Sequence, residues 1–358
     1  MLSGLCLIVR NLFAGQFFRK FDNTRKQQRS QELPLVRKAP MTEVQSRQIF
    51  LVMVFWAFAF FCRPVAAQAT ADHPYLPLSI PDHDVKPLRN LVDPQFQKSL
   101  EARLQQNPLW AKLMADKRLA VGLVDLSDPE NVKFARVNGN QMMYAASLPK
   151  LAILLAAENA IEEGKIPNTQ DVQNDLRIMI SQSNNQAATR MYRMVGGAKY
   201  IEKVLRNPHN QFYDTRYGGG LWVGRPYAKG GQRYGDPMKN LSHAATATQV
   251  CRYYYLLAMG KLINRQRSEE MLGYLVDPEL HHKFVNSIER VAPDCKIYRK
   301  SGTWRNWHAD SMLCWGPNWR RYILVGLVED AKGEQILRDL VPAVEEVLRS
   351  HSAAYEVQ

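Results

Sequence analysis

Apolar positions recur with a helical or strand period through most of the chain beyond residue 92. Residues 93–117 carry an apolar side chain every three or four positions, which predicts one continuous helix. The next two segments, 118–126 and 132–137, have the composition of strands separated by a turn. Helical spacing then returns in six segments: 148–161, 172–180, 186–194, 200–205, 247–262 and 268–275. The last third predicts strands at 295–300, 311–315 and 321–329 and a closing helix at 334–348.

Strands at both ends of this region and helices between them predict how the fold is organised. One sheet takes strands from both ends of the chain, and an all-helical block is inserted between them. We therefore predict an α/β (α+β) fold, with an antiparallel sheet flanked by helices and a helical subdomain at about 147–290. Residues 206–242 are rich in Gly, Tyr, Arg and Asn, which predicts a long loop or hairpin insert.

The amino-terminal part of the chain has the character of a targeting segment. Residues 49–62 are an apolar run of 14, shorter than the ~20 residues that a spanning helix needs. Small residues follow it, which predicts a signal peptide cut after Ala67 or Ala69 and a periplasmic or secreted protein. An uncleaved membrane anchor is the alternative, and either Met1 or Met41 is the start. We expect residues 1–67 to be leader and residues 68–92 to be a Pro-rich linker.

The net charge of the chain limits the class of partner that we expect. The formal net charge is +13, of which residues 1–67 contribute +7. The remaining +6 suits an anionic ligand, and with no nucleic-acid motif present we expect no nucleic-acid partner.

Three cysteines follow the leader, at Cys251, Cys295 and Cys314, and their spacing matches no metal site. A Cys295–Cys314 disulfide and three unpaired thiols both stay open.

The first of three short motifs opens the apolar helix at 148–161. It reads Ser147-Leu148-Pro149-Lys150, and this spacing places a hydroxyl and an amine on one face of a first helical turn. A lysine can take a serine's proton when burial or a neighbouring cation lowers its pKa. The structural alternative is a capping serine with an exposed lysine.

The second motif, Ser183-Asn184-Asn185, lies at the end of a predicted helix. Ser183 has a hydroxyl that can relay a proton to a leaving amine, and Asn185 has an amide that can hold a substrate amide. The structural alternative is a turn with a helix cap.

The third motif, Lys300-Ser301-Gly302-Thr303, lies on a predicted strand near the carboxyl end. Lys300 adds positive potential near the first lysine and attracts an anionic substrate, and Gly302 lets a substrate lie against the strand. The structural alternative is an ordinary polar edge strand.

Together the three motifs resemble those of the penicillin-recognising serine hydrolases, especially the class A β-lactamases. That group carries S-x-x-K, S-D-N and K-T-G, and this chain has S-L-P-K, S-N-N and K-S-G in the same order. Residues 181–205 and 244–260 also resemble helices of the family. The resemblance implies a β-lactamase/transpeptidase-like hydrolase domain over residues 93–350.

The resemblance also implies roles for the motif residues. Ser147 is the nucleophile, Lys150 is its general base, and the backbone amides of Ser147 and Thr303 form the oxyanion hole. The implied catalytic residues are Ser147, Lys150, Ser183 and Lys300, and the implied substrate-binding residues are Asn185, Ser301, Gly302 and Thr303. No metal and no cofactor are expected.

Two departures from the family bear on deacylation and on substrate binding. Class A enzymes position the deacylating water with a glutamate on the loop that precedes the Thr-rich helix, whereas residues 204–268 contain no glutamate and only two acids, Asp214 and Asp236. Whether either aspartate takes that role is open. The arginine that grips the substrate carboxylate is also absent from its usual strand, and Arg305 or Arg299 could replace it.

The leading hypothesis is an exported serine hydrolase that opens a β-lactam or a peptide-like amide through an acyl-Ser147 intermediate, with slow deacylation. A D-Ala-D-Ala peptidase or penicillin-binding protein is the alternative, and a non-catalytic cell-wall ligand-binding module is the third hypothesis. We expect a β-lactam or peptidoglycan-like small substrate, a monomer, and contact with a membrane only if residues 49–62 are not removed. The natural substrate and the oligomeric state stay open.

Overall fold

The computed structural model describes residue 76, residues 80–317 and residues 319–353, and the account below refers to these. They all belong to a compact unit that begins at Ala71. The predicted leader, both candidate start residues and the first part of the predicted linker lie outside the described residues. The end of that linker packs against the unit, because Leu88 is buried in the core and Val92 bridges to Phe134.

A five-stranded antiparallel sheet organises the unit, with the order β2-β1-β10-β9-β8. Its strands are β1 (Leu119–Asp125), β2 (Lys133–Val137), β8 (Lys296–Trp304), β9 (Trp307–Trp315) and β10 (Arg321–Glu329). The first two come from the start of the unit and the other three from its end, as predicted from the sequence. β8 lies at one edge, so one side of its backbone is free of a neighbouring strand.

β8 and β9 are longer than predicted. The pattern predicted strands at 295–300 and 311–315, but the two strands continue to Trp304 and from Trp307, and only Arg305 and Asn306 connect them. Arg305 has a φ of 52°, the left-handed conformation that a tight two-residue hairpin turn requires. The whole third motif therefore lies on a regular strand.

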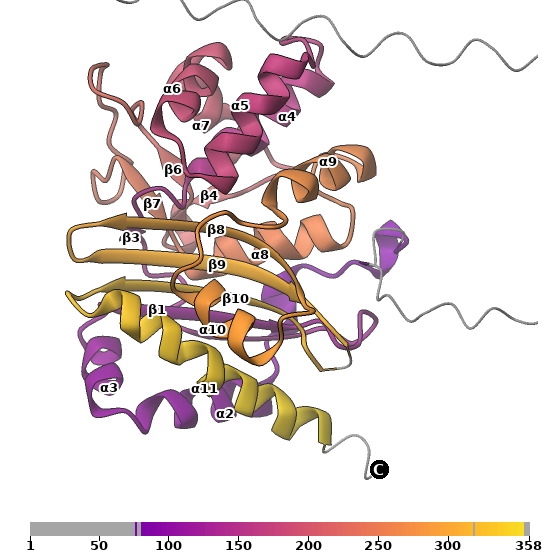
Figure 1. Ribbon diagram of the computed structural model, residues 1–358, viewed down its shortest axis with the longest axis vertical. Coiled ribbons are helices and arrows are strands. Elements are labelled where there is room, and N and C mark those ends of the chain that lie inside the picture. The colour runs from indigo at the N-terminus through magenta and orange to yellow at the C-terminus, as the bar shows by residue number, and fades with distance from the viewer. Residues whose placement is uncertain (1–75, 77–79, 318, 354–358) are drawn as a thin grey trace, which may run out of the picture. The chain divides into compact units, whose positions relative to one another are not determined.

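Four helices cover one face of the sheet, and Figure 1 shows α10 and α11 in front of it. They are α2 (Pro94–Gln105), α3 (Pro108–Ala115), α10 (Phe284–Val291) and α11 (Gly333–Ala353). Their apolar faces form one core with the sheet around Phe96, Phe284 and Leu337. None of the helices in the described part of the chain combines the length and the apolar character needed to cross a bilayer.

The helical block lies on the other side of the sheet. Its helices are α4 (Lys150–Glu162), α5 (Gln170–Ser181), α6 (Asn185–Met194), α7 (Gly197–Arg206), α8 (Ala247–Ala258) and α9 (Arg265–Leu275). α8 packs on β1 and β10. α4 is buried almost all round, which is the property of a central helix.

Two helix predictions were wrong in detail. The helix expected over 93–117 is interrupted, because Pro108 disfavours a helical conformation at Asn107, and the Asn107 side chain caps α3 instead. Helix α10, over Phe284–Val291, was not predicted.

The predicted insert at 206–242 consists of short strands and turns. It contains β4 (Tyr213–Asp214), β5 (Gly219–Gly220) and β6 (Trp222–Val223). β6 joins a second sheet with β3 (Met143–Tyr144) and β7 (His243–Ala245), in the order β3-β7-β6. Because β3 ends three residues before Ser147, this small sheet supports the turn that carries the first motif.

Candidate active site

The first motif forms the turn that leads into α4. Ala146 has a φ of 50°, a rare conformation for a residue with a Cβ atom, and the Leu148 amide donates to the Ala145 carbonyl. Ser147 is partly exposed, whereas Lys150, the first residue of α4, is fully buried. Among the described residues, no hydrogen bond joins the Ser147 hydroxyl to a partner, and the Lys150 amine bonds Ser183 and Asn185 instead.

Lys150 is held by the second motif. Its Nζ donates to the Ser183 carbonyl at 2.5 Å, to Asn185 Oδ1 at 2.8 Å and to Ser183 Oγ at 3.2 Å. Burial lowers the pKa of Lys150 to about 7, because a charged amine loses its hydration there. A large fraction of this amine is therefore neutral at physiological pH, as a general base must be.

The second motif combines a helix cap with contacts to Lys150. Asn184 caps α6 by accepting from the amides of Gln186 and Ala187. Ser183 adopts a φ of 57°, and this strained backbone conformation allows both of its oxygens to face Lys150. The structural alternative thus describes Asn184, while Ser183 and Asn185 contact the lysine.

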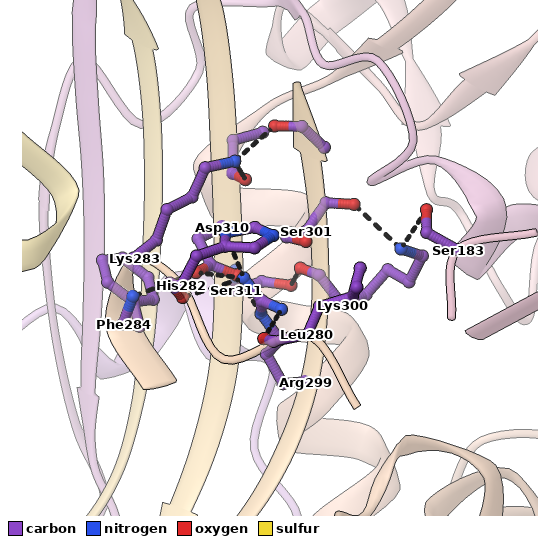
Figure 2. A network of polar contacts seen from close by, with 12 residues as sticks. Ser183, Leu280, His282, Lys283, Phe284, Arg299, Lys300, Ser301, Asp310 and Ser311 are labelled. Carbon is purple, nitrogen blue, oxygen red and sulfur yellow. Dashed lines mark hydrogen bonds and ion pairs between the residues drawn. The ribbon is translucent and has the colours of Figure 1, made fainter. Parts of the chain in front are cut away.

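Lys300 contacts the same serine, as Figure 2 shows. Its Nζ donates to Ser183 Oγ at 3.0 Å and to the Ser301 carbonyl at 2.9 Å. Burial, with Lys150 and Arg299 nearby, holds the pKa of Lys300 well below its usual value. The Ser183 hydroxyl therefore links two buried amines, and no carboxylate of the described residues lies within ion-pair distance of either.

Gly302 is required by the turn at Ser147. A Cβ atom on Gly302 would lie 2.3 Å from the Ala145 carbonyl oxygen and 2.6 Å from the Ser147 backbone nitrogen. No side chain fits in that space. We expected this glycine to make room for a substrate, and the structure shows that it lets β8 approach the serine. This contact brings all three motifs together.

Two residues that the sequence did not single out complete the site. The ring of Tyr227 lies 4.6 Å from Lys150 Nζ, and its hydroxyl donates to the Ala146 carbonyl at 3.1 Å. His243 packs against this ring at 4.3 Å, and burial lowers the pKa of His243 to about 4, so it is neutral. No sequence signal marked Tyr227, because it lies in an irregular insert.

Asp214 and Asp236 form hydrogen bonds and an ion pair within the insert at 206–242. Asp236 is buried and accepts from the Tyr213 hydroxyl and from the amides of Met238, Lys239 and Leu241. Asp214 pairs with Arg216 at 2.8 Å. Neither carboxylate contacts Ser147 or Lys150.

The structure pairs one of the two candidate arginines, Arg299, within the fold, and the substrate-binding role of Arg305 stays a prediction. Arg299 is buried and pairs with Asp310 through two hydrogen bonds, of 2.7 and 2.9 Å. The Arg299 charge is thus neutralised by the Asp310 carboxylate inside the protein. Arg305 lies beside the exposed ring of Trp304, while Trp307 packs against Tyr144.

The β8–β9 hairpin also brings two cysteines close together. Cys314 pairs in register with Ile297, two residues after Cys295, and the two thiols are near enough to shift each other's pKa. All three described cysteines are free thiols in this structure, and the disulfide stays a prediction.

Solved structures with a similar fold include β-lactamases and PBP-A. The β-lactamase of Xanthomonas campestris pv. campestris has a TM-score of 0.56 at 15% identity, over 71% of this chain and 98% of its own. That of Sphaerobacter thermophilus has a TM-score of 0.54 at 15% identity, over 70% and 97%. A mutant of PBP-A, solved as its acyl-enzyme complex with penicillin G, has a TM-score of 0.53 at 17% identity, over 76% and 100%.

Among curated protein sequences, none matches this chain significantly. A family model does match, and its two segments, residues 107–175 and 171–346, include all three motifs and most of the described residues. By this match and its fold, the chain belongs to the β-lactamase enzyme family.

Proposed function

We propose that this chain is an exported serine hydrolase that opens a β-lactam or peptide-like amide through an acyl-Ser147 intermediate. One observation carries the proposal: two buried amines without carboxylate partners meet at the Ser183 hydroxyl, beside a partly exposed serine. This arrangement suits acyl transfer, because it supplies a nucleophile, a base of lowered pKa and a proton relay.

The proposed chemistry begins at Lys150. Its neutral amine takes the proton of the Ser147 hydroxyl, and Ser147 Oγ attacks the carbonyl carbon of the substrate. The amides of Ser147 and Thr303 stabilise the negative charge that forms on the carbonyl oxygen. The carbon–nitrogen bond then breaks, and the leaving nitrogen takes the Ser183 hydroxyl proton, which the protonated Lys150 replaces.

Slow deacylation is part of the proposal. No carboxylate of the described residues contacts Ser147 or Lys150, and the ring of Tyr227 covers one side of the lysine. General-base catalysis by a positioned group contributes ~100- to 10,000-fold, which is about 3–5 kcal/mol of barrier. We therefore expect the acyl-enzyme to accumulate; an acyl-enzyme complex with penicillin G has been solved for a mutant of PBP-A, which has a similar fold.

A D-Ala-D-Ala peptidase, that is, a penicillin-binding protein, is the second candidate. The same missing carboxylate favours it, since a peptidase of this kind reacts with penicillin and releases it slowly. A non-catalytic cell-wall module is the least favoured reading, because it gives no role to the pKa shift of Lys150. Turnover of an acyl-D-Ala-D-Ala peptide would identify the peptidase.

The test is pre-steady-state kinetics with a chromogenic cephalosporin, combined with intact mass. We expect a burst of one product per enzyme, slow turnover and an adduct on Ser147. Ser147→Ala should abolish both burst and adduct, while the control Ser127→Ala, in the β1–β2 turn, should keep them. Fast turnover without a burst would disprove slow deacylation, and an adduct that persists in Ser147→Ala would disprove the nucleophile.

Export is proposed on the amino-terminal pattern alone. The mass of the protein recovered from a secreting host should correspond to a chain that begins after Ala67 or Ala69. Recovery of the full-length chain in the membrane fraction would instead favour the uncleaved anchor.

A further inference from the structure

Lys283 is a fully buried lysine that none of the three motifs contains. It immediately precedes α10 and adopts a φ of 56°, which is strained for a residue with a side chain. Its Nζ donates to the Gly302 carbonyl at 2.7 Å, to Thr303 Oγ1 at 2.8 Å and to the Ala309 carbonyl at 3.1 Å. All three ammonium donors are thus used, and all three acceptors are neutral.

The position of these acceptors points to the reaction site. Gly302 and Ala309 are partners in the β8–β9 register, and Gly302 is the residue whose α-carbon lies against the Ser147 backbone. Figure 2 shows Lys283 reaching β8 from the side opposite Ser183. Lys283 therefore fixes the segment of β8 that faces the nucleophile.

The Gly302 carbonyl and the Thr303 amide belong to one peptide group. In a planar trans peptide the C=O and N–H bonds point in opposite directions. An ammonium that binds the carbonyl oxygen therefore turns the N–H away from itself. It also polarises the amide, because hydrogen bonds in a chain strengthen one another.

We propose that Lys283 is a positioning residue that orients and polarises the Gly302–Thr303 peptide, so that the Thr303 amide is a stronger oxyanion donor. The inference rests on the proposed function, since it needs an acyl transfer at Ser147. Lys283 touches neither substrate nor nucleophile and acts through this peptide.

The charge on Lys283 gives the inference a pH signature. Burial lowers the pKa of Lys283 to about 8, so its ammonium is present below about pH 8 and is lost above it. The ionisable groups that face it come from β8, β9, α11 and its own loop: Arg299, Lys300, His308, Asp310, Glu334 and His282. Its support of the oxyanion should accordingly weaken in alkaline solution.

The test compares acylation rate constants of the full-length protein and Lys283→Met between pH 6 and 10. Removing an oxyanion donor costs about 100- to 1,000-fold, so weakening one should slow acylation about 10- to 100-fold near pH 6.5. The ratio of the wild-type rate to the variant rate should shrink above pH 8. Lys239→Met, which removes a lysine hydrogen bond to the Met142 carbonyl, is the control and should stay within twofold of wild type.

A ratio near one at pH 6.5, or a deficit that is the same at every pH, would overturn the inference. A second readout uses the wild-type protein alone, in case Lys283→Met does not fold. The infrared ester carbonyl stretch of the acyl-enzyme should move to higher frequency between pH 6.5 and 9.5, and a constant frequency would contradict the inference. If the wild-type protein forms no adduct at any pH, the proposed function itself has failed.

Discussion

Helix α4 carries two buried ionisable groups whose hydrogen-bond partners differ in charge. At its start, Lys150 is bound only by neutral oxygens of the second motif. Two turns later, Glu158 belongs to an arginine cluster, in which Arg267 donates to Glu158 at 3.1 Å, to Glu162 at 2.9 Å and to Glu270 at 2.6 Å. One end has cations without carboxylates, and the other has three carboxylates around one cation.

Under the proposed function, the difference separates an amine that reacts from a charge that stabilises the fold. An amine that is buried without a counterion loses its proton readily, so it becomes a base near neutral pH. Arg267 cannot lose its proton and joins α4 to α9 through ion pairs. The same contrast recurs on β8, where Arg299 is fixed by Asp310 and the next residue, Lys300, binds only Ser183 and a carbonyl.

The largest effect is expected from removing the reactive amine. Lys150→Met should slow acylation by about 100- to 10,000-fold, the usual range for a general base. The variant should stay folded, because methionine is an unbranched side chain of similar volume that fills the same space. Stopped-flow acylation and differential scanning calorimetry measure the two effects. A rate within tenfold of wild type would show that another group is the base.

A carboxylate placed beside Lys150 should give this amine an ion-pair partner, as Arg267 has at the other end of α4. Asn185→Asp puts a negative charge where an oxygen now lies 2.8 Å from the amine. An adjacent opposite charge raises a lysine pKa by one unit or more, so acylation at pH 7 should fall by about tenfold and recover at higher pH.

The matched control is Asn184→Asp, which adds the same charge at the α6 cap. Its pH–rate profile should move by less than half a unit. If both variants shift the profile equally, the local pairing of Lys150 is not what sets its pKa.

A substitution of Glu158, at the other end of α4, should leave acylation unchanged and should alter only stability. Burial raises the pKa of Glu158 to about 7, so the protonated acid favours the folded state. The stability that this proton contributes is complete below about pH 4.5 and is lost as the pH rises to about 7. Glu158→Gln mimics the protonated acid, and it should be about 3 kcal/mol more stable than wild type at pH 7.5.

Calorimetry at two pH values checks this, since the gain should disappear at pH 4.5. Glu162→Gln is the control and should give no gain at pH 7.5, because the Glu162 side chain is 43% exposed. A gain of equal size in both variants would mean that relief of general acidic repulsion, rather than the burial of Glu158, is responsible.

Patterning and motif order predicted the sheet, the helical block and the grouping of the three motifs. Helix and strand periods are local properties, so α4 and β10 could be recognised directly. Tyr227, Lys283 and the Arg299–Asp310 pair could not, because their importance comes from contacts between distant segments. The contact between Gly302 and the Ser147 turn was missed for the same reason, and the substrate-binding role of this glycine stays a prediction.

The central claim is that buried, unpaired amines make Lys150 a base near neutral pH, and the pH dependence of acylation tests it most directly. The acylation rate constant of the wild-type protein with a cephalosporin should rise about tenfold per pH unit up to about pH 7, the pKa of Lys150. It should be greatest between pH 7 and 8. A rate that keeps rising toward ~10.4, the pKa of an ordinary lysine, or one that does not depend on pH, would contradict the account.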